Sequence, residues 1–363
     1  MVRTLGLQGP VADAFLATPR EAFVPEWVPR IGLSGIYRPE APLATKTDAN
    51  GQAISSSSAP AVMAPMLTSL DLRPGHRVLE IGTGTGYNAA LLAHLVGPRG
   101  KVVSVELDPD IAKAARAALR SVGARVRVVT GDGHVGVPEA APFDRLIATA
   151  AAPTVPRAWF EQLRDGGLVE LPFQTVGIGA LPTLVKEGDR LLTRSVILGG
   201  FMGMRRSSDD VGPRHPAVSS GEQSARSQRA AYLAGPVITS LGRAGRRSLR
   251  RVLADAPSVA RWGKGAEPIG YLLVAGRRAV QYQGDAGWGA GVVAESGLGA
   301  AVVARTPRGL KRLTWGTGAE HLLDEQLTAW RTLGQPGLDR LRLTISFPKK
   351  GPGRIRRSWA APS

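Results

Sequence analysis

The clearest pattern of apolar and polar positions is a short apolar run, followed by glycines at alternate positions and a helical stretch. The apolar run predicts a strand that is buried on both faces. The glycines predict a tight turn, because glycine takes positive φ and has no Cβ. These three parts lie at residues 78–81, at Gly82, Gly84 and Gly86, and at residues 87–96. Together they predict the first unit of a nucleotide-binding α/β sheet.

Similar patterns recur along the first 200 residues. An amphipathic helix is expected at 109–122, and antiparallel strands over 180–198. We expect a helix at 11–17, a loop over 31–53 and a helix at 61–70 that begins after Pro60. Further strands are predicted at 101–106, 126–130, 143–148 and 168–172. This order predicts an α/β, doubly wound, Rossmann-like sheet with an antiparallel edge.

The remaining residues predict a second, smaller α+β domain. The expected boundaries are a first domain at 1–200, a polar linker at 201–232, a second domain at 233–348 and a disordered basic tail at 349–363. The second domain begins with an arginine-rich helix. Short strands at 270–274, 279–282, 291–304 and 312–315, a helix at 319–333 and a strand at 341–347 are expected to follow.

Charge separates the two parts. The chain carries a net charge of +17, of which residues 1–200 contribute +2 and residues 201–363 contribute +15. A surplus of this size in one part predicts an acidic partner, which could be a nucleic acid, an anionic surface or an acidic peptide.

Composition narrows the class of protein further. The chain has no cysteine, which excludes disulfides and thiolate chemistry and is typical of a cytoplasmic protein. No apolar run approaches the ~20 residues of a membrane span, and the N-terminus lacks the layout of a signal peptide. The five histidines are scattered, so we expect no metal site.

Two acidic residues indicate which nucleotide-like ligand the sheet would bind. Glu106 ends the second strand, 20 residues after Gly86, where a carboxylate can accept hydrogen bonds from a ribose. Tyr87 stands where the usual dinucleotide fingerprint has its third glycine, and Glu80 lies inside the strand. These features suit S-adenosylmethionine, which has no pyrophosphate and carries an ammonium group. Asp132, between two glycines after the third strand, could reach the adenine of such a ligand.

Four consecutive serines, residues 55–58, precede Pro60 and the helix that follows it. A helix N-terminus with free N–H groups and nearby hydroxyls can hold a carboxylate. We therefore expect this segment to face the substrate.

These residues together resemble the protein-L-isoaspartate O-methyltransferase family. The similarity covers roughly residues 15–200, and its motifs are 20–25, 51–52, 58–60, 78–87, 131–133, 141–144, 149–153 and 161–167. Members of this family transfer a methyl group from S-adenosylmethionine to an aspartyl or isoaspartyl carboxylate, and S-adenosylhomocysteine is the product.

The resemblance implies a set of site residues. Ser57 and Ser58 would be catalytic, and Ser55, Ser56, Ala61 and Thr149 would contact the substrate. The cofactor would be held by Glu80, Gly82, Thr83, Gly84, Thr85, Gly86, Tyr87, Asn88, Glu106, Leu107, Gly131, Asp132 and Gly133.

Two departures from the family pattern lie on the substrate side. The serine run is three residues longer than usual, so either Ser55 or Ser58 takes the place of the family serine, and Ala61 replaces the usual histidine. The basic second domain is absent from ordinary repair enzymes. This combination resembles the extended members that tailor ribosomally made peptides such as lanthipeptides, lasso peptides and graspetides. In those, an aspartyl ester goes on to an aspartimide; residues 330–336 are also similar to their C-terminal domains.

The resemblance therefore favours methylation of an aspartyl carboxylate in an acidic peptide or protein, and a macrocyclic precursor peptide is one such substrate. An isoaspartyl repair enzyme is the alternative. A nucleic-acid methyltransferase is a further alternative, but the fourth strand ends in residues 149–153 rather than in the motif of exocyclic-amine methylation. A carboxylate is ionised at neutral pH, so methylation needs positioning more than a general base.

Overall fold

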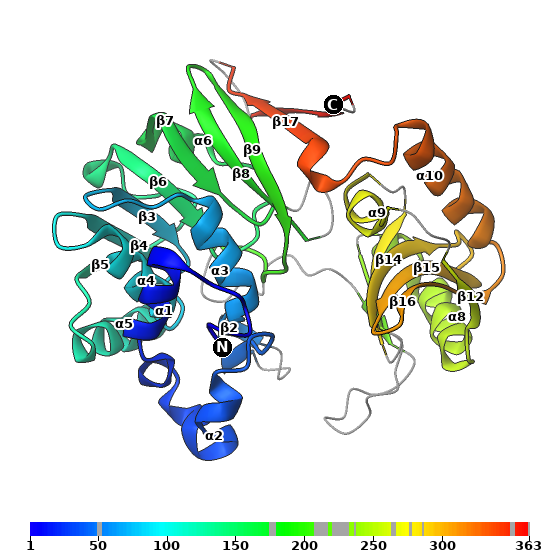
Figure 1. Cartoon of the computed structure of the whole chain (residues 1–363), viewed down its shortest axis with the longest axis horizontal. Coiled ribbons are helices and arrows are strands. Elements are labelled where there is room, and N and C mark those ends of the chain that lie inside the picture. The colour runs from blue at the N-terminus through cyan, green and yellow to red at the C-terminus, as the bar shows by residue number, and fades with distance from the viewer. Residues whose placement is uncertain are drawn as a thin grey trace. The chain divides into compact units, whose positions relative to one another are not determined.

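The computed structural model describes residues 1–48, 53–173, 179–206, 217–219, 232–235, 237–262, 266–275, 278–284, 287–348 and 353–361. The chain divides into two compact units (Figure 1). The first unit comprises Met1–Thr175, Leu181–Pro213 and Leu343–Arg356. The second comprises Val176–Ala180, Arg214–Arg342 and Arg357–Ser363.

The first unit is built on a nine-stranded sheet with the order β18-β17-β9-β8-β7-β6-β3-β4-β5. The strands β5, β4, β3, β6 and β7 are parallel, whereas β8 pairs antiparallel with β7 and β17 pairs antiparallel with β9. This confirms the predicted Rossmann-like α/β sheet with an antiparallel edge. The strands are β3 (Arg77–Ile81), β4 (Lys101–Glu106), β5 (Val126–Thr130), β6 (Phe143–Ala148), β7 (Leu163–Glu170), β8 (Ala180–Glu187), β9 (Arg190–Leu198), β17 (Leu341–Ser346) and β18 (Arg354–Trp359).

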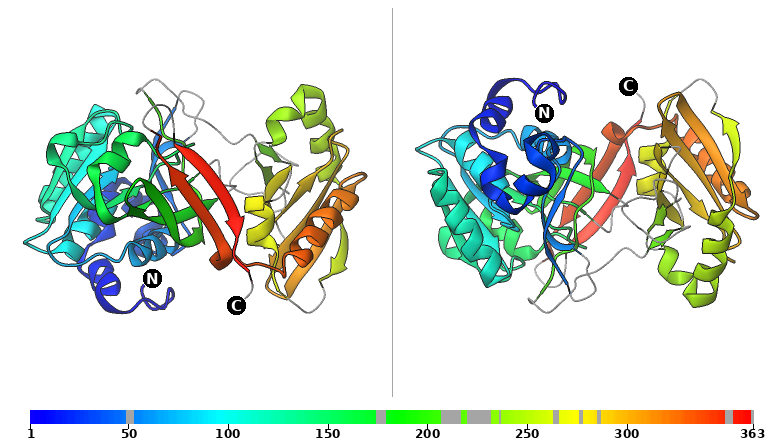
Figure 2. Two further views of the ribbon diagram at one scale, coloured as in Figure 1. Left: turned by 90° about the horizontal axis from the view of Figure 1, so that it is seen from above. Right: turned by 90° about the horizontal axis from the view of Figure 1, so that it is seen from below.

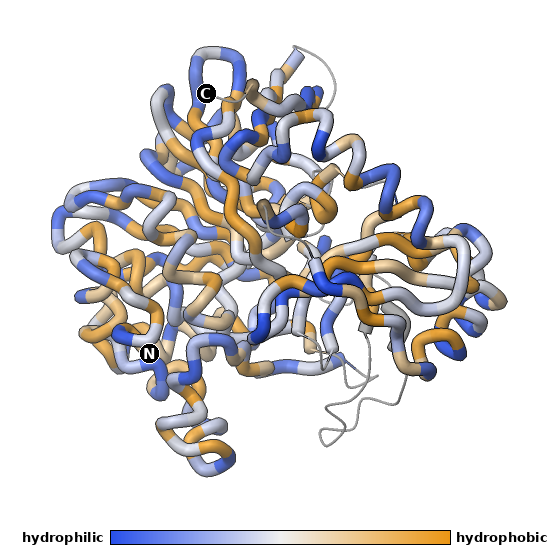
Figure 3. Tube along the Cα trace, turned by 45° about the vertical axis from the view of Figure 1, so that its right-hand side comes forward, coloured by the Kyte–Doolittle hydropathy of each residue, from blue (hydrophilic) through white to orange (hydrophobic). Residues whose placement is uncertain are grey.

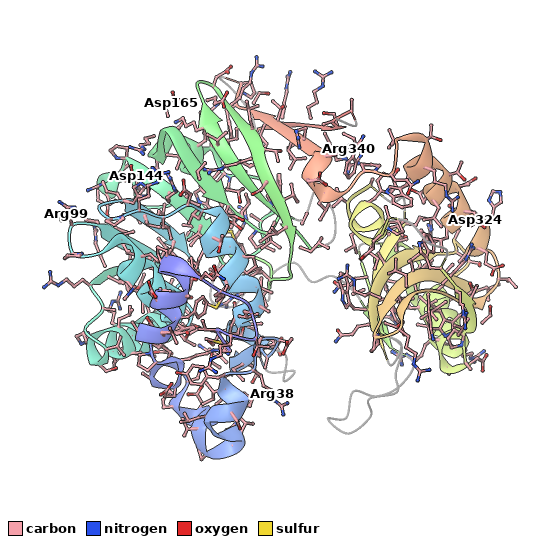
Figure 4. All side chains as sticks on the ribbon, viewed as in Figure 1. Arg38, Arg99, Asp144, Asp165, Asp324 and Arg340 are labelled. Atoms are coloured by element: carbon pink, nitrogen blue, oxygen red, sulfur yellow. The ribbon has the colours of Figure 1, made fainter. Side chains whose placement is uncertain are left out.

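Helices pack on this sheet through one hydrophobic core. Its buried side chains include Phe15, Met66, Val78 and Leu91 from three helices and a central strand. Hydrophobic segments, drawn in orange, run along both strands and helices in Figure 3. Asp144, labelled in Figure 4, accepts a hydrogen bond from the Arg77 amide at 2.6 Å and so fixes the start of β3 against β6. The helices are α1 (Gly9–Ala17), α3 (Pro60–Ser69), α4 (Tyr87–Val96), α5 (Pro109–Ser121) and α6 (Arg157–Gln162), with a short 3₁₀ turn at Pro138–Ala140.

The segment before α3 is more ordered than the predicted loop over 31–53. It contains 3₁₀ turns at Arg20–Phe23 and Pro25–Trp27, then α2 (Val28–Ile36), β1 (Leu43–Thr47) and β2 (Ala53–Ser57). β1 and β2 form a separate antiparallel pair. The loop prediction was wrong here because neither strand has a strong apolar alternation, and each is stabilised by pairing with the other.

The second unit contains a seven-stranded antiparallel sheet with the order β10-β11-β13-β14-β15-β16-β12. Leu313 of β16 packs in a core with Leu249 of α8, whereas the neighbouring Arg312 pairs with Asp324 of α10. Because adjacent strand residues point to opposite faces, α8 and α10 cover opposite faces of this sheet (Figure 2). The elements are β10 (Ala217–Ser219), β11 (Tyr232–Ala234), α7 (Val237–Ser240), α8 (Gly242–Ala254), β12 (Ser258–Arg261), α9 (Ile269–Ala275), β13 (Ala279–Gly284), β14 (Gly287–Val293), β15 (Gly299–Thr306), β16 (Gly309–Gly316), α10 (Glu320–Thr332) and a 3₁₀ turn at Leu338–Arg340.

Two predictions for the second half of the chain were wrong, and one confirmed strand lies in another sheet than expected. The apolar run at 270–274 is the helix α9 rather than a strand, since a fully apolar run has no periodicity to distinguish the two. The strand predicted at 341–347 is present as β17, but it joins the sheet of the first unit. The tail predicted to be disordered contains β18, which extends that same sheet. Most of the linker predicted at 201–232 lies outside the described residues.

Within the part of the chain that the structure describes, no helix is long and apolar enough to cross a membrane.

Candidate active site

The glycine-rich loop between β3 and α4 has the geometry that its sequence predicts. Gly82, Gly84 and Gly86 have φ values of +95°, +52° and +90°, a region that side chains with a Cβ avoid. A Cβ on Gly82 would lie 2.6 Å from the hydroxyl oxygen of Thr149, so the loop also needs a bare glycine for packing. The Thr85 hydroxyl accepts a hydrogen bond from the Tyr87 amide at 3.4 Å, which helps to begin α4.

Glu106 holds this loop at the end of β4. Its carboxylate accepts hydrogen bonds from the Gly84 amide at 2.9 Å and from the Asp108 amide at 3.1 Å. Burial raises the pKa of Glu106 above its ordinary value, although both amide donors act in the opposite direction. Leu107, half-buried, follows it in the loop. The structure thus brings the predicted acid and the glycine loop into direct contact.

Glu80 lies beneath the loop rather than at its surface. Its side chain is completely buried, and it accepts hydrogen bonds from Asn88 at 2.8 Å and from the Ser104 hydroxyl at 2.5 Å. Burial raises its pKa to about 7. Ser104 also shares a 2.6 Å hydrogen bond with Thr83. This geometry does not support the prediction that Glu80 contacts the ammonium group of a cofactor; Glu80, Asn88 and Thr83 support the loop from below.

The turn after β5 contributes Asp132 at the same edge of the sheet. Gly131 donates its amide to the Glu106 carbonyl at 2.9 Å, which places the turn beside the end of β4. Asp132 accepts hydrogen bonds from the amide and the ring of His134 at 2.9 and 2.7 Å. Burial alone would raise the pKa of Asp132, but these contacts with His134 outweigh it and lower that pKa. Gly133 packs against Ile81 and has no room for a Cβ.

Thr149 closes the site at the end of β6. Its hydroxyl donates to the Gly82 carbonyl at 2.6 Å, and its amide donates to the Ile81 carbonyl at 2.9 Å. It therefore braces the loop, and its predicted role in contacting substrate is not visible in these bonds.

The four serines divide into two pairs, because most of them lie in β2 and alternate strand residues point to opposite faces. Ser55 and Ser57 are buried, and their hydroxyls bind Thr45 at 3.1 Å and Arg20 at 3.4 Å. Ser56 and Ser58 are half-buried, and their hydroxyls have no partner among the described residues. The hydroxyl of Ser57, predicted to be catalytic, is thus engaged in the structure of the site, whereas Ser56 and Ser58 remain available.

The N-terminus of α3 does not offer the free N–H groups that the sequence suggested. Pro60 has no N–H, and the Ala61 amide donates to the Pro39 carbonyl at 2.9 Å. The next two amides both donate to the Ala59 carbonyl. The prediction that these donors hold a carboxylate was wrong, because backbone carbonyls already satisfy them.

Arg20 is the residue that ties the serine segment to the rest of the unit. It is fully buried, and its guanidinium donates to the carbonyls of Ile36 at 2.6 Å, Ser57 at 3.2 Å and Ser58 at 3.0 Å. It also lies 5.9 Å from the centre of the Tyr87 ring at the start of α4. Sequence reasoning quoted Arg20 only as part of a family motif and assigned it no role.

Lys46 and Asp108 form a second connection that sequence reasoning missed. The Lys46 ammonium lies 2.5 Å from the Asp108 carboxylate, whose other oxygen caps α5. This pair links β1 to the loop that follows Glu106. Its signal could not be read from the sequence because the two residues are far apart along the chain.

The site fits a nucleoside-bearing methyl donor. The loops after β3, β4, β5 and β6 all lie at the carboxyl edge of the parallel sheet, where α/β folds bind ligands. A Cβ on Gly131 would meet nothing within 4 Å, and one on Gly84 would meet only the Ser56 carbonyl, so there is free space at these two glycines of the site. The described residues contain no group of three side chains that could hold a metal ion.

This fold and this site define the class of S-adenosylmethionine-dependent methyltransferases. The model of the family described as "Protein-L-isoaspartate(D-aspartate) O-methyltransferase (PCMT)" matches residues 3–198. The chain belongs to this family, whose members are S-adenosylmethionine-dependent carboxyl O-methyltransferases, and it is an enzyme of that kind.

Individual relatives agree with this assignment. The protein-L-isoaspartate O-methyltransferase of Ignicoccus hospitalis is 43% identical over 194 residues, which cover 53% of this chain and 87% of the relative. That of Thermotoga maritima is 38% identical over 212 residues, which cover 56% and 65% of the two chains. A solved protein-L-isoaspartate O-methyltransferase is similar over 98% of this chain and 96% of its own, with 25% identity and a TM-score of 0.55. The second unit is thus matched by this solved structure, whereas the family model and the Ignicoccus hospitalis relative match the first half of the chain.

Proposed function

We propose that the enzyme methylates the free α-carboxylate of L-isoaspartyl residues in peptides and proteins. The observation that supports this most strongly is the similarity to a protein-L-isoaspartate O-methyltransferase along almost the whole chain, second unit included. This is the isoaspartyl repair activity, which the sequence offered as the alternative to tailoring of a precursor peptide.

S-adenosylmethionine, when bound, supplies an electrophilic methyl group on its sulfonium. Glu106 would accept hydrogen bonds from the ribose, and the loop from Gly82 to Gly86 would approach the ligand closely because it has no side chains of its own at three positions. The side chains of Ser56 and Ser58 would donate hydrogen bonds to the substrate carboxylate and aim one oxygen at the methyl carbon. The carboxylate oxygen gains the methyl group and the carbon–sulfur bond breaks, which leaves S-adenosylhomocysteine.

No residue of this chain needs to remove a proton. A free α-carboxyl has an ordinary pKa of about 3.3–3.7, so the nucleophile is ionised at neutral pH before it binds. The enzyme contributes position and exclusion of water. The methyl ester is then open to attack by the next backbone amide nitrogen, which expels methanol and forms a succinimide.

A second candidate is the tailoring of a ribosomally made precursor peptide at a normal aspartate. The long serine run and Ala61 favour it, since both departures from the family pattern lie on the substrate side. The second unit does not favour peptide tailoring over repair, because a solved protein-L-isoaspartate O-methyltransferase is similar to this part of the chain too. Cytoplasmic location stays a prediction in either case.

The test is a competition between three peptides in one reaction with S-adenosylmethionine, followed by mass spectrometry. One peptide contains isoaspartate, the second has aspartate in the same sequence, and the third is an acidic peptide closed into a ring. Repair predicts that only the isoaspartyl peptide gains a methyl group. Methylation of the ring-bearing peptide alone would replace the proposal with the tailoring function.

A further inference from the structure

Helix α8 of the second unit presents one face of unpaired arginines. Arg243, Arg247, Arg250 and Arg251 are exposed and Arg246 is half-buried. At 3.6 residues per turn Arg243, Arg247, Arg250 and Arg251 form one continuous face away from the buried Leu249 and Leu253, and Arg246 lies at its border with the buried side. Within the part of the chain that the structure describes, none of the five guanidinium groups has a hydrogen bond or an ion pair.

Other arginines of this unit do have partners. Arg312 makes two hydrogen bonds to the carboxylate of Asp324 on α10, which Figure 4 labels, and Arg305 pairs with Glu267. Arg278 donates to the Val293 carbonyl at 2.9 Å. Some arginines of this unit are thus paired with acidic side chains or carbonyls, whereas five unpaired ones follow one another on α8.

The arginine face does not stabilise the unit in which it lies. Like charges at i and i+4 on a helix destabilise it by about 0.2–0.5 kcal/mol for each pair, and α8 contains no acidic residue to offset them. The helix is held by its apolar side, since Leu249 and Leu253 enter the core of the unit. A partner with negative charge would remove this repulsion.

Among the strands that the structure describes, an edge strand comes next along the chain after α8. Residues 255–257 connect α8 to β12, which is the last strand in the order of its sheet and pairs with β16 on one side. All four residues of β12 are exposed, with Val259 at 57%.

Some backbone amides and carbonyls of β12 are not used in pairing with β16. The Trp262 amide donates to the Leu310 carbonyl, and antiparallel ladders alternate, so the amides and carbonyls of Val259 and Arg261 point away from β16. Unpaired edges of this kind accept a further strand. Arg261 also lies opposite Lys311, which is a like-charge pair across the strands.

We propose that α8 and β12 form a docking surface for an extended acidic polypeptide segment. The segment would add to β12 as an antiparallel or parallel strand through the backbone groups of Val259 and Arg261. Its carboxylates would pair with Arg261 and with the arginine face of α8. A nucleic acid could satisfy the arginines, but it has no backbone ladder for the open edge, so the two features together favour a polypeptide.

The test uses the full chain and a fluorescein-labelled peptide of alternating glutamate and threonine, with binding measured by fluorescence anisotropy. The double variant Arg247→Glu/Arg250→Glu is expected to weaken binding at least about tenfold, since two attractions become repulsions. Val259→Pro is expected to weaken it about tenfold as well, because proline removes an outward amide without removing a bond to β16. Circular dichroism and methylation of a short isoaspartyl peptide check that each variant is folded.

Matched controls separate this surface from net charge alone. Arg308→Glu/Arg331→Glu changes the charge equally at exposed positions outside α8 and β12, and Val259→Thr keeps the amide; each should change the affinity by less than about threefold. The proposal is overturned if wild type does not bind the peptide, if Val259→Pro binds it unchanged, or if duplex DNA of equal charge binds more tightly at the same salt concentration.

Discussion

The two units of this molecule use charged residues in opposite ways. The first unit buries several charged side chains, and five of them make hydrogen bonds to backbone or side-chain groups: Arg20, Glu80, Glu106, Asp108 and Arg145. A sixth, Glu170, is completely buried, and its carboxylate has no hydrogen-bond partner among the described residues. In the described part of the second unit no charged side chain is buried, and α8 exposes arginines without partners. Buried charges fix the backbone of the methyl-transfer site, whereas exposed charges are free to meet another molecule. A net charge taken from sequence cannot distinguish these two uses.

The largest effect is expected at Arg20, the buried cation of the first unit. Arg20→Met would leave the carbonyls of Ile36, Ser57 and Ser58 without donors, at a cost of about 3 kcal/mol or more in the free energy of unfolding. Urea unfolding followed by circular dichroism measures this. Arg38→Met, at an exposed arginine labelled in Figure 4, is the control and should change stability by less than about 0.5 kcal/mol. If Arg20→Met and Arg38→Met changed the free energy of unfolding equally, the claim that buried charges hold the first unit together would be wrong.

The buried carboxyl of Glu80 is expected to make the free energy of unfolding depend on pH. Its pKa is about 7 in the folded protein, against 4.5 for the ordinary group, so the folded state retains a proton that the unfolded state has lost. The free energy of unfolding should therefore fall by about 3 kcal/mol as the pH rises from about 4.5 to 7, and level off above that.

The variant Glu80→Gln should lack this part of the pH dependence. Urea unfolding of both proteins at a series of pH values gives the comparison, with Glu139→Gln on the surface as the control. Parallel pH profiles for wild type and Glu80→Gln would show that the carboxyl at position 80 does not titrate in this way.

Glu106 is a buried charge of the first unit whose role can be measured through the affinity for S-adenosylhomocysteine. Glu106→Gln replaces a carboxylate that accepts hydrogen bonds from two backbone amides, one of them in the glycine loop, at the proposed ribose position. A hydrogen bond to a charged group contributes about 1.5–3 kcal/mol, so the affinity for S-adenosylhomocysteine should fall roughly ten- to a hundredfold. Isothermal titration calorimetry measures it, and unchanged affinity would exclude Glu106 from the cofactor site.

Much of the site could be predicted from local sequence, and the rest depends on contacts between distant residues. The strand at 78–81, the glycine turn and Glu106 carry their own signals: a buried apolar run, residues that permit positive φ, and an acid at a strand end. The hydrogen-bond partners of Ser57 and Ala61 could not be predicted in this way, because Arg20 and Pro39 lie far away in the chain. The return of β17 and β18 to the first sheet was likewise invisible, since a strand's partner is not encoded in its own residues.

The smallest of these effects concerns the serines. Ser56→Ala/Ser58→Ala should lower kcat/KM for an isoaspartyl peptide about tenfold, because two unpartnered hydroxyls near the glycine loop are lost. Ser57→Ala should lower it less than about threefold, since that hydroxyl binds Arg20. A larger loss with Ser57→Ala than with the double variant would restore Ser57 as the residue that faces substrate.

The most direct test of the account is time-resolved mass spectrometry of one isoaspartyl peptide and its aspartyl counterpart. The enzyme should add a single methyl group to the isoaspartyl α-carboxyl, and the ester should then lose methanol without further action of the enzyme. Methylation of both peptides at equal rates, or of neither, would contradict the proposed function.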